Sequence, residues 1–208
     1  MIPLNEAILF VMAAMALAMV PGPDNIFVMM LSALNGFKAG IAVVAGLCSG
    51  LVVHTMAAAM GISAIFQTSP VAFNVVKILG ALYLLYLAWQ SWNAGKSDTS
   101  SGVQAPDSLK SLYIRGLVMN ITNPKVTIFF LAFLPQFANP AMGSVTAQMI
   151  QLGLLFIASA MLVFTAIAWF AGGLGDWLKH SPKAQTVMNR CTSVVFVGLA
   201  LKLVVSER

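Results

Sequence analysis

Two short proline-containing stretches hold the residues whose types and spacing are least expected in an apolar chain. PGPDN (21–25) and NITNPK (120–125) each place a charged residue, Asp24 or Lys125, directly after a proline. A proline removes a backbone donor and interrupts a helix, and a charge in the hydrocarbon of a membrane is costly. One interpretation is a pair of simple helix kinks. The other, which the two charges favour, is a binding or translocation site.

The first stretch can end one helix and begin another. Gly22 suits the cap of a new helix and Pro23 its first position. The carbonyl groups freed around Val20 to Gly22 would find partners in lipid only within the protein or in a water-filled cavity. The candidate site residues of this stretch are Pro21, Gly22, Pro23, Asp24 and Asn25.

The second stretch has the same character. Asn123 is a good N-cap and Pro124 again suits the first helical position, while Asn120 and Thr122 offer side-chain partners for unpaired backbone. Lys125 would lie at the unfavourable end of the helix dipole, so it needs a counter-charge, a substrate carboxylate or an aqueous path. Two half-helix N-termini that face one cavity would form a site for a carboxylate. Asn120, Asn123, Pro124 and Lys125 are therefore candidate site residues.

A histidine and two runs of small residues lie in the second apolar run of the chain. His54 is either a hydrogen-bonded packing residue or a proton-handling residue, and it is included among the candidate site residues. The runs Gly46–Gly50 and Ala57–Gly61 predict close helix packing.

The elements that must position these residues are membrane-spanning helices. The 208 residues are 60% hydrophobic and 8% charged, whereas soluble domains carry about 25% charge. A helix needs about 20 apolar residues to cross the hydrocarbon core of a bilayer. We predict an all-α integral membrane protein with six transmembrane helices, the first and fourth broken at prolines. The six runs are roughly 4–34, 39–66, 71–92, 113–137, 147–174 and 187–205.

A polar stretch divides the chain into two similar parts. Residues 93–112 form a predicted cytoplasmic linker between two three-helix repeats, 1–92 and 113–208, of one membrane domain. Because each repeat has an odd number of spans, the second would be inverted in the membrane. Breaks at matching positions of inverted repeats indicate the binding site of a transporter. They would bring Asp24 and Lys125 together, or to one cavity, near the midplane.

The basic residues predict the orientation. Seven lie in the loops after the first, third and fifth spans and three near the opposite ends of the spans, which by the positive-inside rule places those loops in the cytoplasm and both termini outside. If the first segment instead doubles back, the N-terminus lies inside. The two groups are Lys38, Lys96, Lys110, Arg115, Lys179, Lys183 and Arg190, and Lys77, Lys202 and Arg208.

Several other classes of protein fit the sequence poorly. The net charge of +5 comes from scattered residues, so it does not indicate nucleic-acid binding. No nucleophile–base pair or metalloprotease motif predicts an enzyme, and no cofactor is implied. Cys48 and Cys191 match no metal or disulfide spacing and are predicted to be buried free thiols. The first nine residues contain no Lys or Arg, which argues against a cleaved signal peptide.

Four segments together resemble the LysE/RhtB family of amino-acid exporters over essentially the whole chain. They are PGPDN (21–25), GLVVH (50–54), KILGALYLLYLAW (77–89) and NITNPK (120–125) followed by FFLAFLPQF. The resemblance implies efflux of amino acids or their derivatives across the bacterial cytoplasmic (inner) membrane, driven by the proton motive force. It is closer to the homoserine/threonine-type branch than to the lysine/arginine branch. The expected partners are an amino acid, protons and the lipid bilayer. The sequence leaves the oligomeric state open, with a homo-oligomer among the alternatives.

The distribution of acidic residues favours a neutral substrate. Apart from Asp24, acids lie only near span ends or in the linker, so a cationic side chain would find no second carboxylate. The acids in question are Glu6, Asp176 and Glu207, and Asp98 and Asp107. We therefore expect export of threonine, homoserine or leucine in preference to lysine or arginine. A metal-ion exporter or a basic amino-acid exporter of the same superfamily is the alternative.

Overall fold

The computed structural model describes residues 2–20, 22–68, 70–93 and 108–205, and every regular element within these ranges is helical. The all-helical class predicted from the sequence is confirmed over this part of the chain. The predicted linker falls largely outside the described residues. The helices are α1 (Leu4–Met19), α2 (Pro23–Asn35), α3 (Phe37–Thr68), α4 (Pro70–Asn93), α5 (Leu109–Ile121), α6 (Pro124–Ile128), the π-helix η1 (Phe129–Phe133), the 3-10 helices η2 (Leu134–Phe137) and η3 (Pro140–Met142), α7 (Val145–His180) and α8 (Pro182–Val205).

Turn and capping residues explain several of these boundaries. α2 ends before Gly36, whose φ of 84° is a left-handed value that suits glycine. The hydroxyl of Ser108 accepts a hydrogen bond from the N–H of Ser111 at the start of α5. Ser144 caps α7 in the same way. α8 begins at Pro182, where the missing N–H costs the helix nothing.

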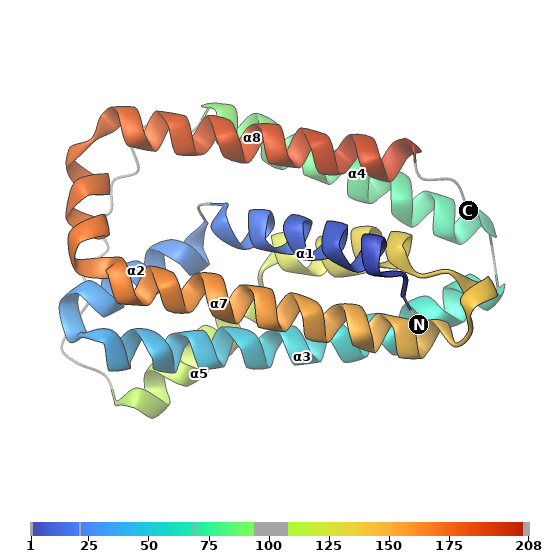
Figure 1. Cartoon of the computed structure of the whole chain (residues 1–208), viewed down its shortest axis with the longest axis horizontal. Helices are drawn as coiled ribbons and strands as arrows, with labels where there is room; N and C mark the ends of the chain where they lie inside the picture. Colours follow the sequence, from blue (N-terminus) through green and yellow to red (C-terminus); the bar gives the residue numbers. More distant parts are fainter. Residues whose placement is uncertain (1, 21, 69, 94–107, 206–208) are drawn as a thin grey trace.

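The helices form a bundle with a separate pair along one side (Figure 1). α3 packs against both α5 and α7, and α1 and α2 pack against α7. α4 and α8 pack chiefly on each other, and α4 reaches the bundle mainly through η1. The guanidinium of Arg190 lies 5.4 Å from the centre of the Trp92 ring and so joins α8 to α4.

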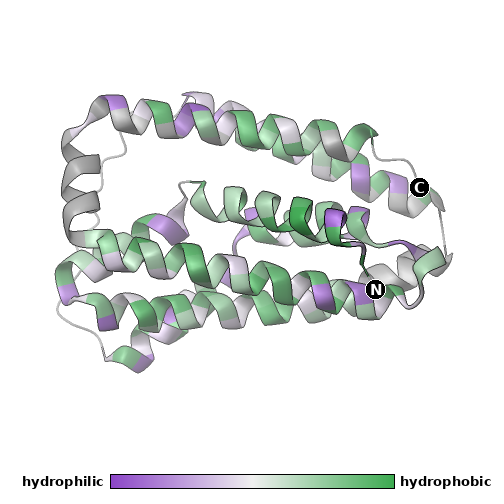
Figure 2. Ribbon diagram, in the orientation of Figure 1, coloured by the Kyte–Doolittle hydropathy of each residue, from purple (hydrophilic) through white to green (hydrophobic). Residues whose placement is uncertain are grey.

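Apolar residues make up most of the helices, and hydrophilic residues lie at the start of α2 (Figure 2). Within the described residues, Phe37–Gly61 and Val145–Ala171 are each long and apolar enough to cross a membrane. Two bent pairs also qualify if each counts as one span: α1 with α2, bent by 63°, and Leu109–Ile121 with Pro124–Phe137, bent by 49°. Both bends lie at the stretches where the sequence predicts breaks.

An aromatic cluster fixes the second bent segment to the bundle. The ring of Phe129 lies 4.7 Å from that of Phe133 and 5.1 Å from that of Phe156, measured between centroids. Phe10 of α1 stacks edge-on against Phe137 at 5.1 Å. The cluster therefore connects η1 and η2 to α1 and α7, and it buries the part of the chain that follows the second break.

Glycines let α3 and α5 approach closely. A Cβ atom at Gly46 would overlap the carbonyl oxygen of Tyr113, and one at Gly116 would lie 2.5 Å from the carbonyl oxygen of Val43. One at Gly50 would lie 2.6 Å from Oδ1 of Asn120. Close packing at the Gly46–Gly50 run is confirmed. In the second run, Ala58 and Ala59 are buried, whereas an added Cβ at Gly61 would meet no atom within 4 Å, so close packing does not extend to Gly61 among the described residues.

Candidate functional site

The first break separates α1 from α2 over three residues. Gly22 has extended backbone angles (φ −156°, ψ 178°) and is the N-cap of α2, and Pro23 is the first helical residue, as their types predict. The side-chain amide of Asn25 donates a 2.7 Å hydrogen bond to the carbonyl oxygen of Ala18. This bond satisfies a carbonyl that the end of α1 leaves free, so Asn25 compensates in part for the break.

The second break separates α5 from α6. Asn123 is the N-cap of α6, and its Oδ1 accepts a 3.0 Å hydrogen bond from the N–H of Lys125. The carbonyl oxygen of Asn120 lies 3.1 Å from Nε2 of His54 on α3. Because a carbonyl can only accept, Nε2 carries the hydrogen and donates. His54 therefore packs against the end of α5 and supports the break.

A side-chain hydrogen bond joins the two breaks. Nδ2 of Asn123 donates to Oδ2 of Asp24 at 2.7 Å, and both side chains are buried. The partners are 99 residues apart in the sequence. Since Oδ1 of Asn123 already accepts from a backbone N–H, the orientation of its amide is fixed from both sides. Asn123 thus holds the first turns of α2 and α6 against each other.

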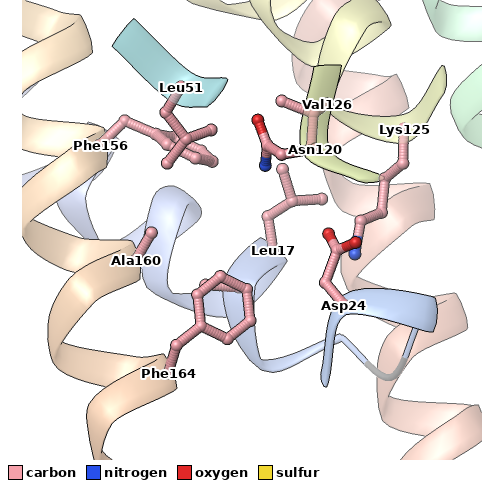
Figure 3. A pocket seen from close by; sticks show the side chains of 10 residues that line it. Leu17, Asp24, Leu51, Asn120, Lys125, Val126, Phe156, Ala160 and Phe164 are labelled. Atoms are coloured by element: carbon pink, nitrogen blue, oxygen red, sulfur yellow. The ribbon is translucent and has the colours of Figure 1, made fainter. Parts of the chain in front are cut away.

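The two charged candidates lie at the same pocket. Figure 3 shows the side chain of Lys125 extending from α6 toward the carboxylate of Asp24, and the two charges interact. Nζ of Lys125 also lies 3.1 Å from the position that a Cβ atom at Gly22 would take. Asp24 and Lys125, which the sequence analysis expects at one cavity, both line this pocket.

Three buried oxygen atoms around the breaks have no hydrogen-bond partner among the described residues: Oδ1 of Asp24, Oδ1 of Asn25 and Oδ1 of Asn120. All three are acceptors, and a buried acceptor without a donor is costly. Two of the three residues, Asp24 and Asn120, line the pocket. A group with N–H donors bound in the pocket, such as an ammonium, would satisfy the oxygens of Asp24 and Asn120.

The pocket combines a few polar groups with many apolar ones, as ligand sites commonly do. Its volume is about 10 Å³, which is on the scale of one water molecule. An amino acid would therefore fit only after the surrounding helices move apart. The lining residues are Leu17, Ala18, Asp24, Leu51, Asn120, Lys125, Val126, Phe156, Ala160 and Phe164.

Most of the predicted site residues gather at the two breaks. Gly22, Asp24, Asn25, Asn120, Asn123 and Lys125 do so through the contacts above, and His54 touches this group through Asn120. Pro23 and Pro124 shape the breaks, but their own rings are exposed. Pro21 lies outside the described residues.

One prediction about the cysteines is wrong. Cys48 is buried, as expected, but Cys191 is exposed on α8. In a membrane protein an apolar stretch can face lipid, so its composition does not show that a residue is buried in protein. Within the described residues, no group of three or more His, Cys, Asp or Glu side chains could hold a metal ion.

The sequence did not point to the apolar wall of the pocket. Phe156, Ala160 and Phe164 lie four residues apart on one face of α7, and Leu51 faces the pocket from α3. A small residue between two phenylalanines at helical spacing was the available signal. It is weak, because α7 is apolar on every side.

Comparison with known proteins gives consistent matches over nearly the whole chain. The sequence profile of the LysE type translocators matches residues 15–207. The homoserine/homoserine lactone efflux protein of Salmonella typhimurium (strain LT2) is 31% identical over 188 residues, which cover 90% of each chain. The leucine efflux protein of Klebsiella pneumoniae is 30% identical over 202 residues, 93% of this chain and 92% of the relative. The leucine efflux protein of Enterobacter sp. (strain 638) is 28% identical over 195 residues, with the same coverage. No solved structure gives a significant match.

Proposed function

Because the chain belongs to the family of LysE-type translocators, we propose that it is a secondary transporter that exports small neutral amino acids from the cytoplasm, driven by the proton motive force. The resemblance seen in its sequence motifs is confirmed by the family match. The protein is a multi-pass protein of the inner membrane. The relatives named for homoserine and leucine efflux support an amino-acid substrate.

The observation that carries this proposal is the pair of opposite charges, Asp24 and Lys125, at one pocket between two broken helices. An amino acid at neutral pH is a zwitterion whose ammonium and carboxylate are separated by one carbon atom. We assign the ammonium to the unpaired Oδ1 of Asp24 and the carboxylate to Nζ of Lys125. The positive end of the α6 dipole adds to the attraction for the carboxylate.

The distribution of acidic residues at this pocket also favours a substrate whose side chain is neutral. Asp24 is the only acidic residue that lines the pocket in the part of the chain that the structure describes. A lysine or arginine substrate would bring a second positive charge without a second carboxylate, and a site that leaves this charge unpaired binds the substrate weakly.

We place the site between two inverted three-helix repeats, 1–92 and 113–208, with six spans in all and residues 93–112 in the cytoplasm. The matching bends of 63° and 49° at the two breaks support this arrangement. Single cysteines at Ser100 and Gly143, in a variant without Cys48 and Cys191, test the orientation. A membrane-impermeant thiol reagent applied from outside should label position 143 and not position 100, and the reverse pattern would contradict the assignment.

Transport by the purified protein tests the function itself. Proteoliposomes are loaded with a panel of radiolabelled amino acids, and efflux is followed with and without an imposed proton gradient. We expect efflux of neutral amino acids that a proton ionophore reduces, and little efflux of lysine or arginine. Efflux of lysine or arginine alone would refute the neutral specificity and leave the transporter assignment intact.

A further inference from the structure

The pocket has two chemically different sides. Its polar groups come from the residues at the breaks, Asp24, Asn120 and Lys125, and Figure 3 shows them on one side. The opposite side is formed by α7, which contributes Phe156 and Phe164. An amino acid whose charged groups bind at the breaks therefore directs its side chain toward α7.

The α7 side of the pocket is a continuous apolar wall. Phe156, Ala160 and Phe164 follow one another at intervals of four residues, so they share one face of the helix, and each is at most 4% exposed. Leu17 of α1 and Leu51 of α3 extend the wall. None of these side chains can donate or accept a hydrogen bond.

Two hydroxyl groups close to this wall in sequence, those of Thr55 and Ser159, are already engaged. Oγ1 of Thr55 donates to the carbonyl oxygen of Leu51 at 2.7 Å. Oγ of Ser159 donates to the carbonyl oxygen of Leu155 at 2.8 Å. Each is bound to its own helix, and neither lines the pocket. A substrate hydroxyl group directed at this wall, away from Asn120 and the breaks, would meet only carbon atoms.

We propose that this wall makes the transporter select aliphatic amino acids over hydroxylated ones of the same shape, with Ala160 setting the room for the side chain. The inference rests on the proposed function and adds the choice between the two kinds of neutral substrate. Burial of a hydroxyl without a partner is unfavourable, whereas a methyl group in its place gains from the same surroundings. Ala160 is the smallest residue of the α7 wall, so a side chain enters opposite it.

Isosteric pairs of amino acids give the direct test with the unmodified protein. Valine and threonine differ by a methyl in place of a hydroxyl, and norvaline and homoserine differ in the same way. In proteoliposomes, we expect the transport efficiency (Vmax/KM) of the aliphatic member to be about 10- to 100-fold higher in both pairs, the range for an apolar pocket that receives an added hydroxyl. Equal or better transport of threonine and homoserine would overturn the proposal while transport itself persists. Failure of all four to be transported would instead overturn the proposed function, and this inference with it.

A matched pair of variants tests the role of Ala160. Ala160→Leu fills the wall, whereas Ala158→Leu makes the same change at an exposed position of α7. We expect the first variant to reduce leucine transport at least about tenfold relative to alanine transport, and the second to leave the ratio unchanged. An unchanged ratio in a folded Ala160→Leu protein would contradict the assignment. If that variant does not fold, the isosteric pairs still decide the proposal.

Discussion

The two breaks interrupt helices with the same residue types, yet they differ in charge and in capping. α2 has Gly22 as its N-cap, without a side-chain hydrogen bond, and carries Asp24 in its first turn. α6 has Asn123 as its N-cap, whose side chain accepts from the N–H of Lys125, and carries Lys125 in its first turn. An acid in the first turn offsets the positive end of the helix dipole, whereas a lysine adds to it. The site therefore has an anionic end at α2 and a cationic end at α6, which suits a zwitterion better than a simple anion.

The helices that follow the breaks differ as well. α2 continues as a regular α-helix of 13 residues. α6 lasts five residues before the chain becomes the π-helix η1 and then the 3-10 helix η2. Such π segments occur frequently at functional sites. The two half-helices are therefore not equivalent, because Asn123 binds the N–H of Lys125 at α6, whereas α2 has no side-chain cap.

Removing either of the two opposite charges should reduce the rate of efflux more than any other change described below. Asp24→Asn and Lys125→Met should each reduce efflux on the order of 100-fold or more, because each leaves the other charge buried and unpaired. The measurement is the initial rate of efflux, normalised to the amount of protein inserted in the membrane. Lys38→Met, an exposed lysine outside the site, is the control. Transport at the wild-type rate in both site variants would refute the role of the pair.

A second comparison concerns how firmly each break is packed. A Cβ atom at Gly50 would lie 2.6 Å from Oδ1 and 2.7 Å from Cβ of Asn120, next to the second break. At the first break, the atom nearest to a Cβ at Gly22 would be Nζ of Lys125 at 3.1 Å, the end of a flexible side chain. Gly50→Ala should therefore lower the free energy of unfolding by about 2–3 kcal/mol, and Gly22→Ala by less.

The readout is unfolding in mixed detergent micelles, with Gly61→Ala as the matched helical control because its added methyl meets no atom. A stability loss for Gly61→Ala as large as that for Gly50→Ala would show that the effect does not come from packing against Asn120.

The local features of the site could be predicted from the sequence because they depend on single residues. Proline and glycine have few compatible positions in a helix, so the starts of α2 and α6 followed from Pro23 and Pro124. To predict that Asp24 and Lys125 lie at one pocket, one more assumption was needed, namely that the two halves are inverted copies. The hydrogen bond between Asp24 and Asn123 spans 99 residues, and no local pattern indicates it.

The apolar wall could not be predicted for a different reason. In a soluble helix, polar residues mark the solvent face and so reveal the buried one. In α7 both faces are apolar, because one packs against the protein and the other is suited to face lipid. Phe164 of the pocket and the exposed Phe170 therefore look alike in the sequence. The same ambiguity explains the error at Cys191.

The asparagines at the two breaks allow a comparison of smaller effects. Asn123 makes two side-chain hydrogen bonds, to Asp24 and from the N–H of Lys125, whereas Asn25 makes one, to the carbonyl of Ala18. We expect Asn123→Ala to cost about 2 kcal/mol of stability and Asn25→Ala about 1 kcal/mol. Asn123→Ala should also slow efflux more, because it frees the carboxylate of Asp24. The reverse order in either measurement would show that the breaks do not depend on these bonds.

The smallest effect is expected at His54, which contacts Asn120 at the second break and Phe130 of η1. Its Nε2 donates to the carbonyl oxygen of Asn120, and its ring lies 5.7 Å from that of Phe130, so its contacts are those of a packing residue. Gln can present an N–H donor at a similar place, so His54→Gln should keep efflux within about twofold of the wild type, whereas His54→Leu loses the bond and about 1 kcal/mol of stability. Proton-driven efflux and substrate exchange without a proton gradient are measured side by side. If His54→Gln abolished the first and preserved the second, His54 would handle protons, and the second break would contribute to energy coupling as well as to substrate binding.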